Sequence, residues 1–217
     1  LAGQLFFMLP TMLIAVPTGV KVFNWATTMW KGSLSFEPPM LFALAFVFLF
    51  TIGGFSGLML AIVPADFQYH DTYFVVAHFH YVLVPGAIFG IMAGVYYWLP
   101  KWTGHMYDLK LATWHFWLST IFVNVLFFPQ HFLGLAGMPR RIPDYNTQFA
   151  DWNMISSLGA FGFGLSQLLF VYIVFSSMRA GVKATDKVWD DGMPHGLEWT
   201  LSSPPPYHSF ETAPEVK

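Results

Sequence analysis

The stretch that decides the fold runs from Tyr69 to Tyr81 and reads YHDTYFVVAHFHY. It opens a segment that stays apolar to about Trp98, which is long enough to cross a membrane as a helix. Two histidines, His78 and His80, therefore lie inside a predicted membrane span. Ionisable side chains at that depth are costly and usually functional, so the segment is predicted to hold a functional site.

The two histidines are predicted to point in nearly opposite directions. A helix turns about 100° per residue, so His78 and His80 diverge by about 200° and cannot share one metal ion while the helix stays intact. Two planar cofactors, one on each side of the helix and each taking one imidazole as axial ligand, satisfy this geometry, with Phe79 between them. The alternative is a pair of core histidines hydrogen-bonded to neighbouring helices.

The composition places the chain among integral membrane proteins. Of its 217 residues, 55% are hydrophobic, 19% aromatic and only 10% charged, whereas charged residues make up about 25% of a soluble domain. There is no cysteine, which leaves histidine, carboxylate and methionine as metal ligands. Nothing at the start of the sequence resembles a signal peptide, and the chain is expected to begin inside a helix, as a fragment or a split subunit would.

Five apolar runs predict an all-α integral membrane protein with five transmembrane helices. They cover about residues 1–30, 40–63, 72–99, 111–135 and 154–178. Residues 1–178 are predicted to form the transmembrane bundle, and residues 179–217 a polar, proline-rich tail on an extended path. Gly159, Gly162 and Gly164 are predicted to let two helices pack closely.

The basic residues fall unequally on the two sides that five spans define. One side holds Lys31, Lys101, Lys110, Arg179, Lys183, Lys187 and Lys217. The other side holds only Arg140 and Arg141 among the basic residues, together with Asp66, His70 and Asp71. Because inner loops carry an excess of lysine and arginine, the first side and the C-terminal tail are predicted to face the cytoplasm or matrix.

Thr18 and Lys21 are three residues apart and share a face of the first span, one turn after Pro17. The ring of Pro17 frees the carbonyl of Leu13 from its helical hydrogen bond. Lys21 lies about 15 Å along the helix from Lys31, at about 1.5 Å per residue, which is deep for a lysine that only reaches the interface. Both that role and a proton relay by a buried amine remain open.

The outer side carries two further candidate groups. Asp71 begins the third span and is predicted to be its N-cap. His70 and Asp71, completed by water and a carboxylate from another chain, would suit a hard cation such as Mg²⁺ or Mn²⁺. Arg140 and Arg141 follow Pro139, and paired guanidinium groups there suit bidentate contacts to an anion such as a haem propionate. Surface charge is the alternative for the arginines.

The remaining polar side chains are given structural roles. His105, His195 and His208 are expected in loops or the tail, without the spacing of metal ligands. Interhelical hydrogen bonds, worth about 0.6–2 kcal/mol each, are predicted for His115, Asn124, His131 and Gln167.

Three motifs resemble subunit I of haem-copper cytochrome c oxidases. They are VPTGVK at 16–21, HDTYFVVAHFHYVL at 70–83 and FFPQHFLGLAGMPRR at 127–141. The match runs from about Val16 to Pro206, with the motifs in the family's order. The resemblance implies that the chain forms the last five helices of a twelve-helix subunit I bundle.

The resemblance also implies roles for individual residues near the predicted haems. His80 would ligate the iron of a low-spin haem a, and His78 that of a high-spin haem a3, with Phe79 between the two. Thr18 and Lys21 match the family's K pathway, which admits protons to the oxygen-reduction site.

At the outer side, the resemblance implies three further sites. By this resemblance, His70 and Asp71 would hold a non-redox magnesium or manganese ion shared with subunit II. Arg140 and Arg141 would contact the haem propionates, and Asp66 would lie near a propionate of the high-spin haem. The alternative for Asp66 is a carboxylate of an outer loop.

The function implied is that of a terminal respiratory oxidase, which reduces dioxygen to water with electrons from cytochrome c and translocates protons. The expected cofactors are haem a, haem a3, copper (CuB) and magnesium or manganese. The family's copper ligands and the second ligand of the low-spin haem belong to helices ahead of this chain, so the chain alone is not expected to be active.

The partners expected from the resemblance are the N-terminal part of subunit I, subunit II with its CuA centre, subunit III, cytochrome c and membrane lipid, but no nucleic acid. The expected location is the bacterial cytoplasmic membrane or the mitochondrial inner membrane.

Two alternative functions stay open. A quinol oxidase of the same superfamily shares these motifs, although Tyr81 modestly favours the cytochrome c branch, and a proton-coupled transporter would use the intramembrane His and Lys without haem.

Overall fold

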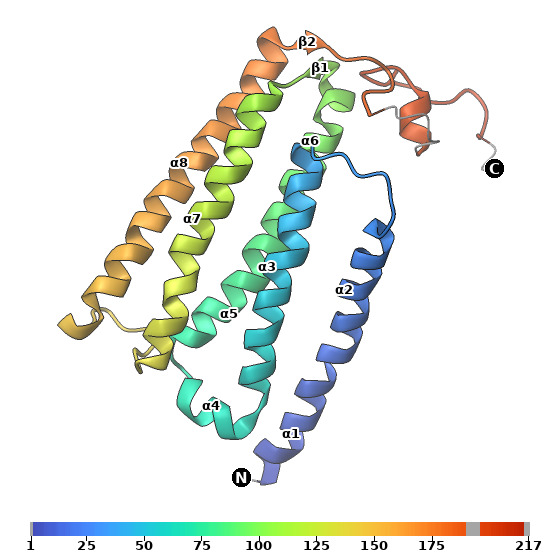
Figure 1. Ribbon diagram of the computed structural model, residues 1–217. Coiled ribbons are helices and arrows are strands. Elements are labelled where there is room, and N and C mark those ends of the chain that lie inside the picture. Colours follow the sequence, from blue (N-terminus) through green and yellow to red (C-terminus); the bar gives the residue numbers. More distant parts are fainter. Residues whose placement is uncertain (1, 190–195, 215–217) are drawn as a thin grey trace.

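The computed structural model describes residues 2–189 and 196–214. Leu1, His195 and Lys217 lie outside the described residues. The chain forms a bundle of long helices (Figure 1). The helices are α1 (Ala2–Leu13), α2 (Ala15–Met29), α3 (Pro38–Ala61), α4 (Val63–Tyr69), α5 (Tyr73–Leu83), α6 (Gly90–Thr103), α7 (Leu109–Leu135) and α8 (Ala150–Ala180).

Five helical segments among the described residues are long and apolar enough to cross a membrane. They cover Ala2–Met29, Pro38–Ala61, Tyr73–Thr103, Leu109–Leu135 and Thr147–Ala180. The predicted all-α architecture with five spans is confirmed, and the helices differ from the apolar runs mainly at their ends. The last helix, for example, begins at Ala150 instead of 154, with Asp151 in its first turn, where a carboxylate favours the helix N-terminus.

Prolines change the geometry of two spans. The first span is divided at Ile14 into α1 and α2, close to Pro17, which cannot donate a helical hydrogen bond. In the third span, Val84–Phe89 winds as a π-helix that contains Pro85 and joins α5 to α6. Such wider turns occur mostly as single-turn bulges and often lie at functional sites.

Helices α7 and α8 pack side by side along the bundle (Figure 1). A methyl group added at Gly159 would collide with the backbone of Leu126, and one at Gly162 with the ring of Phe122. These two glycines therefore permit the close approach that the sequence predicts. Gly164 faces open space, so the prediction is wrong for that residue.

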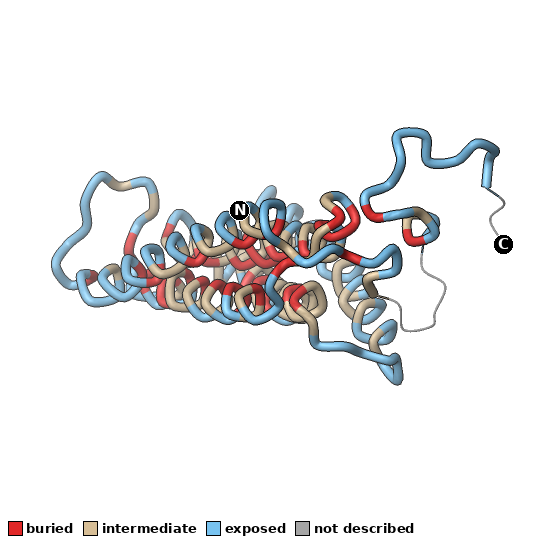
Figure 2. Tube along the Cα trace, turned by 90° about the horizontal axis from the view of Figure 1, so that it is seen from above, coloured by how far each residue is buried: buried red, intermediate tan, exposed pale blue. Residues whose placement is uncertain are grey.

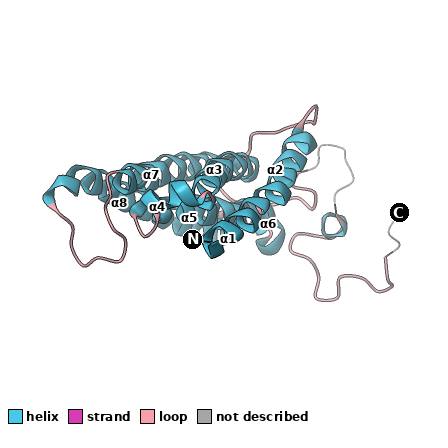
Figure 3. Cartoon of the chain, turned by 90° about the horizontal axis from the view of Figure 1, so that it is seen from below, coloured by secondary structure: helices cyan, strands magenta, loops and turns pink. Residues whose placement is uncertain are grey.

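The apolar core lies where α3, α6, α7 and α8 meet. Phe42, Tyr96 and Phe116 are buried there, and the ring centroid of Phe42 lies 5.8 Å from that of Tyr96 and 5.1 Å from that of Phe116. Figure 2 shows the buried residues gathered on the facing sides of the helices. Helices α1 and α2 contain no buried residue among those described, and they lie on the opposite side of the bundle from α8 (Figure 3).

Two predicted interhelical hydrogen bonds join α7 to the third span. The hydroxyl of Tyr96 lies 2.8 Å from Nδ1 of His115. The hydroxyl of Tyr81 donates to Oδ1 of Asn124 at 2.6 Å. Both predictions are confirmed.

The other two predicted interhelical groups behave differently from each other. Nε2 of Gln167 on α8 donates to Oγ of Ser119 on α7 at 3.2 Å, as predicted. Nδ1 of His131 bonds the carbonyl of Phe128 in its own helix at 3.1 Å, so the interhelical prediction is wrong there. The His131 ring contacts α5 through two aromatic rings, with its centroid 5.3 Å from that of Phe74 and 5.4 Å from that of Tyr81.

The C-terminal tail returns to the end of the bundle where α6 ends and α7 begins, which we call the tail end. Strands β1 (His105–Met106) and β2 (Val182–Lys183) pair there in antiparallel fashion. The tail then forms a 3₁₀ turn at Leu197–Thr200. It is therefore more folded than the extended path that the sequence predicts. The opposite end, which carries α4 and the α7–α8 loop, is called the α4 end (Figure 1).

Candidate functional site

Helix α5 carries both histidines, and Thr72 fixes where it begins. Oγ1 of Thr72 accepts a hydrogen bond from the backbone N–H of Phe74 at 3.3 Å. Asp71 precedes this cap with a left-handed φ of 54°. The predicted N-cap role of Asp71 is wrong, because its carboxylate binds the guanidinium of Arg140 instead of the amide groups of the helix.

The start of α5 is also tied to the loop after α7. The backbone N–H of Tyr73 donates to the carbonyl of Met138 at 3.0 Å, and that of Arg140 donates to the carbonyl of Asp71 at 2.9 Å. A β-bridge links Thr72 and Pro139 between them. These contacts hold the first turn of α5, and with it the histidines, against the arginine-bearing loop.

His78 faces α3. Its Nδ1 lies 2.8 Å from the carbonyl oxygen of Gly53 and 3.1 Å from Oγ of Ser56. A carbonyl can only accept, so Nδ1 carries the hydrogen and Nε2 keeps its lone pair. A methyl group at Gly57 would overlap the imidazole, so this glycine leaves the space in which the ring lies.

His80 faces α7. Its Nδ1 donates to the carbonyl of Val76, one turn earlier in α5, at 2.7 Å. The ring stacks on Phe127 with centroids 4.3 Å apart and an interplanar angle of 12°. The same reasoning leaves Nε2 of His80 with a free lone pair.

The two imidazoles therefore contact different helices, as the helical spacing predicts. Each has its Nδ1–H fixed by a backbone carbonyl, which is the arrangement that orients a metal-ligating histidine and raises the basicity of Nε2. Phe79 lies between them and is 40% exposed. The residues present thus offer two separate imidazole ligands, one Nε2 on each side of α5, as two haem irons would need. They do not fit one protein-bound metal ion, since His78 and His80 face apart.

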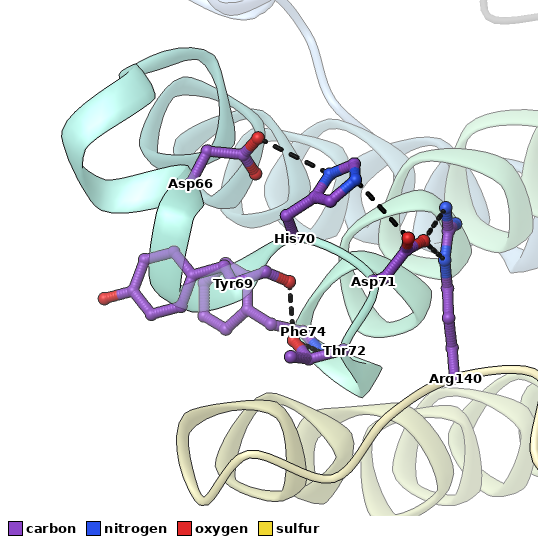
Figure 4. Close-up of polar contacts among 7 residues, drawn as sticks. All are labelled: Asp66, Tyr69, His70, Asp71, Thr72, Phe74 and Arg140. Atoms are coloured by element: carbon purple, nitrogen blue, oxygen red, sulfur yellow. Dashed lines mark hydrogen bonds and ion pairs between the residues drawn. The ribbon is translucent and has the colours of Figure 1, made fainter.

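A chain of polar contacts lies at the α4 end (Figure 4). Nδ1 of His70 lies 3.6 Å from a carboxylate oxygen of Asp66, and Nε2 lies 3.4 Å from Oδ2 of Asp71. The other oxygen of Asp71 accepts from Nη2 of Arg140 at 2.6 Å and from Nε at 2.8 Å. The sequence thus correctly places these residues on one side. Arg141 is exposed, with a φ of 64°, and does not join the contacts.

The Arg140 contact affects the protonation of Asp71. The hydrogen bond from the guanidinium holds the pKa of Asp71 below its usual value. The ion pair is therefore fully present above the pH at which a free aspartate ionises, and it is lost only as the pH falls through the lowered pKa of Asp71.

The His70 and Asp71 pair offers only part of a cation site. Nε2 of His70 and Oδ2 of Asp71 face each other, whereas Oδ1 of Asp71 is held by Arg140. No group of three or more His, Cys, Asp or Glu side chains in the described part of the chain is arranged to hold a metal ion. A divalent ion at this pair would need further oxygen ligands from outside the chain.

Thr18 and Lys21 lie on α2, away from these clusters. Oγ1 of Thr18 donates to the carbonyl of Ile14 at 2.9 Å, so the hydroxyl satisfies a carbonyl next to the one that Pro17 frees. Lys21 is exposed, and no hydrogen bond or ion pair joins it to another described residue. The structure does not bring these two residues into contact with His78 or His80.

Some residues that shape the site were not predicted from the sequence. Gly53, Ser56 and Gly57 on α3 position His78, and Phe127 on α7 positions His80. The run GGFSG at 53–57 is a signal that could have indicated this, because small residues within an apolar span mark close approach. Phe127 carries no such signal.

Comparisons with known proteins show that the sequence of the chain is similar to those of oxidase subunits. Residues 2–162 match the family model described as cytochrome c and quinol oxidase polypeptide I. The chain is 50% identical over 215 residues to cytochrome c oxidase subunit 1 of Cereibacter sphaeroides, which covers 99% of the chain and 38% of that protein. It is 48% identical over 216 residues to quinol oxidase subunit 1 of Bacillus spizizenii, which covers 98% of the chain and 33% of that protein.

A solved structure, described as the cryo-EM structure of a heme-copper terminal oxidase dimer, has the same fold. It superposes with a TM-score of 0.72 at 21% sequence identity, over 83% of this chain and 37% of that one. The chain therefore spans well under half the length of the proteins that it matches.

Proposed function

Because the chain belongs to the cytochrome c and quinol oxidase polypeptide I family, we propose that it is the C-terminal part of the catalytic subunit of a terminal respiratory oxidase. In this proposal the whole subunit reduces dioxygen to water with electrons from cytochrome c and moves protons across the membrane. The chain spans 38% of its Cereibacter sphaeroides relative, and it acts only together with the N-terminal part of the subunit.

The observation that carries the proposal is the orientation of two imidazoles on α5. Nε2 of His78 is proposed to ligate the high-spin haem a3, and Nε2 of His80 the low-spin haem a. The bound haems would supply electron transfer and oxygen chemistry, and the protein positions and tunes them. The carbonyl of Gly53 accepts the Nδ1 hydrogen of His78, and that of Val76 accepts the Nδ1 hydrogen of His80. Each Nε2 therefore keeps its lone pair for a metal.

The aromatic and small neighbours hold these rings in place. Phe127 stacks on His80 and limits its rotation, and Gly57 leaves room for the His78 ring. The ring centroid of Phe79 lies 4.4 Å from that of His80, and this side chain is proposed to fill the space between the haems. A π-helical turn follows at Val84–Phe89, after the second histidine.

The polar cluster at the α4 end, formed by Asp66, His70, Asp71 and Arg140, is proposed to bind the haem propionates and a cation. Arg140 uses Nε and Nη2 on Asp71, and its remaining N–H groups, with those of Arg141, are available for propionates. Asp66 would lie near a propionate of haem a3. His70 and Oδ2 of Asp71 are proposed to hold Mg²⁺ or Mn²⁺, completed by ligands from subunit II.

Lys21 and Thr18 are proposed to deliver protons toward the high-spin haem. The two side chains lie one helical turn apart on α2, and the hydroxyl of Thr18 bonds the carbonyl of Ile14. The Lys21 amine, exposed in this chain, would be covered by the remaining helices of the subunit.

The proposal extends to the assembly and its surroundings. CuB would be ligated by residues outside this chain, and subunits II and III, cytochrome c and membrane lipid are the proposed partners. The complex would lie in the bacterial cytoplasmic membrane or the mitochondrial inner membrane. The tail end, which carries most of the basic loop residues, is proposed to face the cytoplasm or matrix.

A quinol oxidase is the second candidate, because the chain is 48% identical to the Bacillus spizizenii quinol oxidase subunit. Oxygen uptake by the purified complex separates the two candidates when reduced cytochrome c and a ubiquinol analogue are supplied in turn. Turnover with cytochrome c, together with haem a in the pyridine haemochrome spectrum, is expected. Turnover with quinol alone would select the second candidate, and a complex without haem bands would refute both.

A further inference from the structure

Lys101, near the end of α6, is buried although it carries an ammonium group. Only 2% of its surface is exposed. Its Nζ donates hydrogen bonds to the backbone carbonyls of Asp186 at 3.0 Å, Leu201 at 2.7 Å and Ser202 at 3.3 Å. An ammonium has three N–H donors, so every donor has a partner in the C-terminal tail.

The three carbonyls come from two parts of the tail that are joined to each other. The backbone N–H of Ser203 donates to Oδ1 of Asp186 at 3.0 Å, which ties the second part to the first. The ring of Trp199 lies 5.2 Å from Nζ of Lys101, within the range of a cation–π contact. The cation thus lies at the centre of a cluster of carbonyl dipoles and one aromatic face.

The end of α6 is shaped to receive this part of the tail. Nε1 of Trp189 donates to the carbonyl of Tyr97 at 2.9 Å, and the two rings stack with an interplanar angle of 7°. Gly104 ends α6 with a φ of 72°, and a methyl group there would meet Pro204 and the carbonyl of Ser203. The left-handed turn and the missing side chain together allow the tail to approach.

We propose that the ammonium of Lys101 anchors the C-terminal tail, holding residues 184–189 and 196–203 as a fixed cap over the tail end of the bundle. Three carbonyl oxygens that converge on one point repel each other and lose their hydration unless a cation lies between them. Charge-assisted hydrogen bonds are about twice as strong as neutral ones. The charge of Lys101, more than the packing of its stem, therefore keeps the tail in place.

Hydrogen exchange of the purified complex tests this anchor. Lys101→Met keeps the length and apolar stem but removes the three donors. Peptides that cover 184–189 and 196–203 are expected to exchange about tenfold faster or more, because the tail opens locally. Lys110→Met is the matched control, since Lys110 is exposed at the same end of the bundle, and it should leave these peptides unchanged. Wild-type exchange rates in assembled Lys101→Met complex would overturn the proposal.

Amine labelling tests the anchor without altering it, which matters if Lys101→Met prevents assembly. Acetylation of the intact complex should modify Lys101 about tenfold more slowly than Lys110, as the burial predicts. In a complex whose chain is truncated after Thr185, Lys101 and Lys110 should be acetylated at similar rates. Rapid labelling of Lys101 in the intact complex would contradict the proposal, and so would continued protection after truncation, because something other than the tail would then cover it.

Discussion

Gly57 leaves the space in which the His78 ring lies. A methyl group there would overlap the imidazole, so Gly57→Ala should displace the ring from its bond to Gly53 and weaken its hold on the high-spin haem. The expected result is a reduced carbon monoxide difference spectrum per low-spin haem. Gly54→Ala is the control, because a methyl group at Gly54 meets nothing within 4 Å. Equal spectra for the two variants would show that Gly57 does not position the haem ligand.

Asp71 links the polar cluster at the α4 end, because its carboxylate contacts both His70 and Arg140. If His70 and Asp71 hold a divalent ion, complex from cells grown in Mn²⁺ should give an electron paramagnetic resonance signal of bound Mn²⁺. Asp71→Ala should lower the occupancy by about tenfold or more, since loss of a carboxylate ligand removes both charge and a bond. An undiminished Mn²⁺ signal in Asp71→Ala would rule out this site.

For single residues, the sequence predicts the direction in which a side chain points better than it predicts the residues that the side chain contacts. The spacing of His78 and His80 alone predicts that they face apart, because helical geometry is local. The cap of α5 could not be predicted in the same way. Asp71 is a good N-cap by residue type, but its partner Arg140 lies 69 residues away, and only the folded chain reveals that contact.

At the scale of helices, α2 carries the proposed proton route. Lys21→Met removes the titratable group of Lys21 while keeping the stem, so haem content should stay normal while oxygen turnover falls by about tenfold or more. Reduction of the high-spin haem should slow more than that of the low-spin haem. Lys31→Met, in the loop that follows α2, is the control. Near wild-type turnover in the Lys21 variant would mean that this lysine only reaches the interface.

The contact between α7 and α8 can be tested at its glycines. Gly159→Ala would force a methyl group against the backbone of Leu126, which should destabilise the bundle by about 1–3 kcal/mol. Gly164→Ala should be neutral or stabilising, because the added methyl group faces open space and alanine favours a helix by about 1 kcal/mol. Thermal denaturation of the two variants checks this, and an equally low Tm for both would contradict the packing assigned to Gly159.

The spans could be predicted from hydropathy because twenty or so apolar residues in a row have few other folds available in a membrane. Helix ends and kinks were less predictable. The π-helical turn at Val84–Phe89 contains Pro85, whereas Pro10 and Pro129 lie within α-helices. A proline in the sequence therefore does not by itself predict where a helix widens.

At the scale of the whole molecule, the chain has large unpaired apolar faces. No described residue of α1 or α2 is buried, and the chain spans 38% of its Cereibacter sphaeroides relative. We expect the N-terminal part of the subunit to cover these faces.

The fold of the C-terminal tail was the least predictable part of the chain, since the contacts of Lys101 with Leu201 and Ser202 join residues about a hundred positions apart.

The central claim, that two imidazoles on one helix bind two different haems, is tested most directly by spectra of matched histidine variants. In purified complex, His80→Ala should remove the absorption of the low-spin haem while any high-spin haem that assembles still binds carbon monoxide. His78→Ala should abolish carbon monoxide binding and leave the low-spin haem spectrum in place. If both substitutions instead removed the same single spectral species, His78 and His80 would serve one cofactor and the account would be wrong.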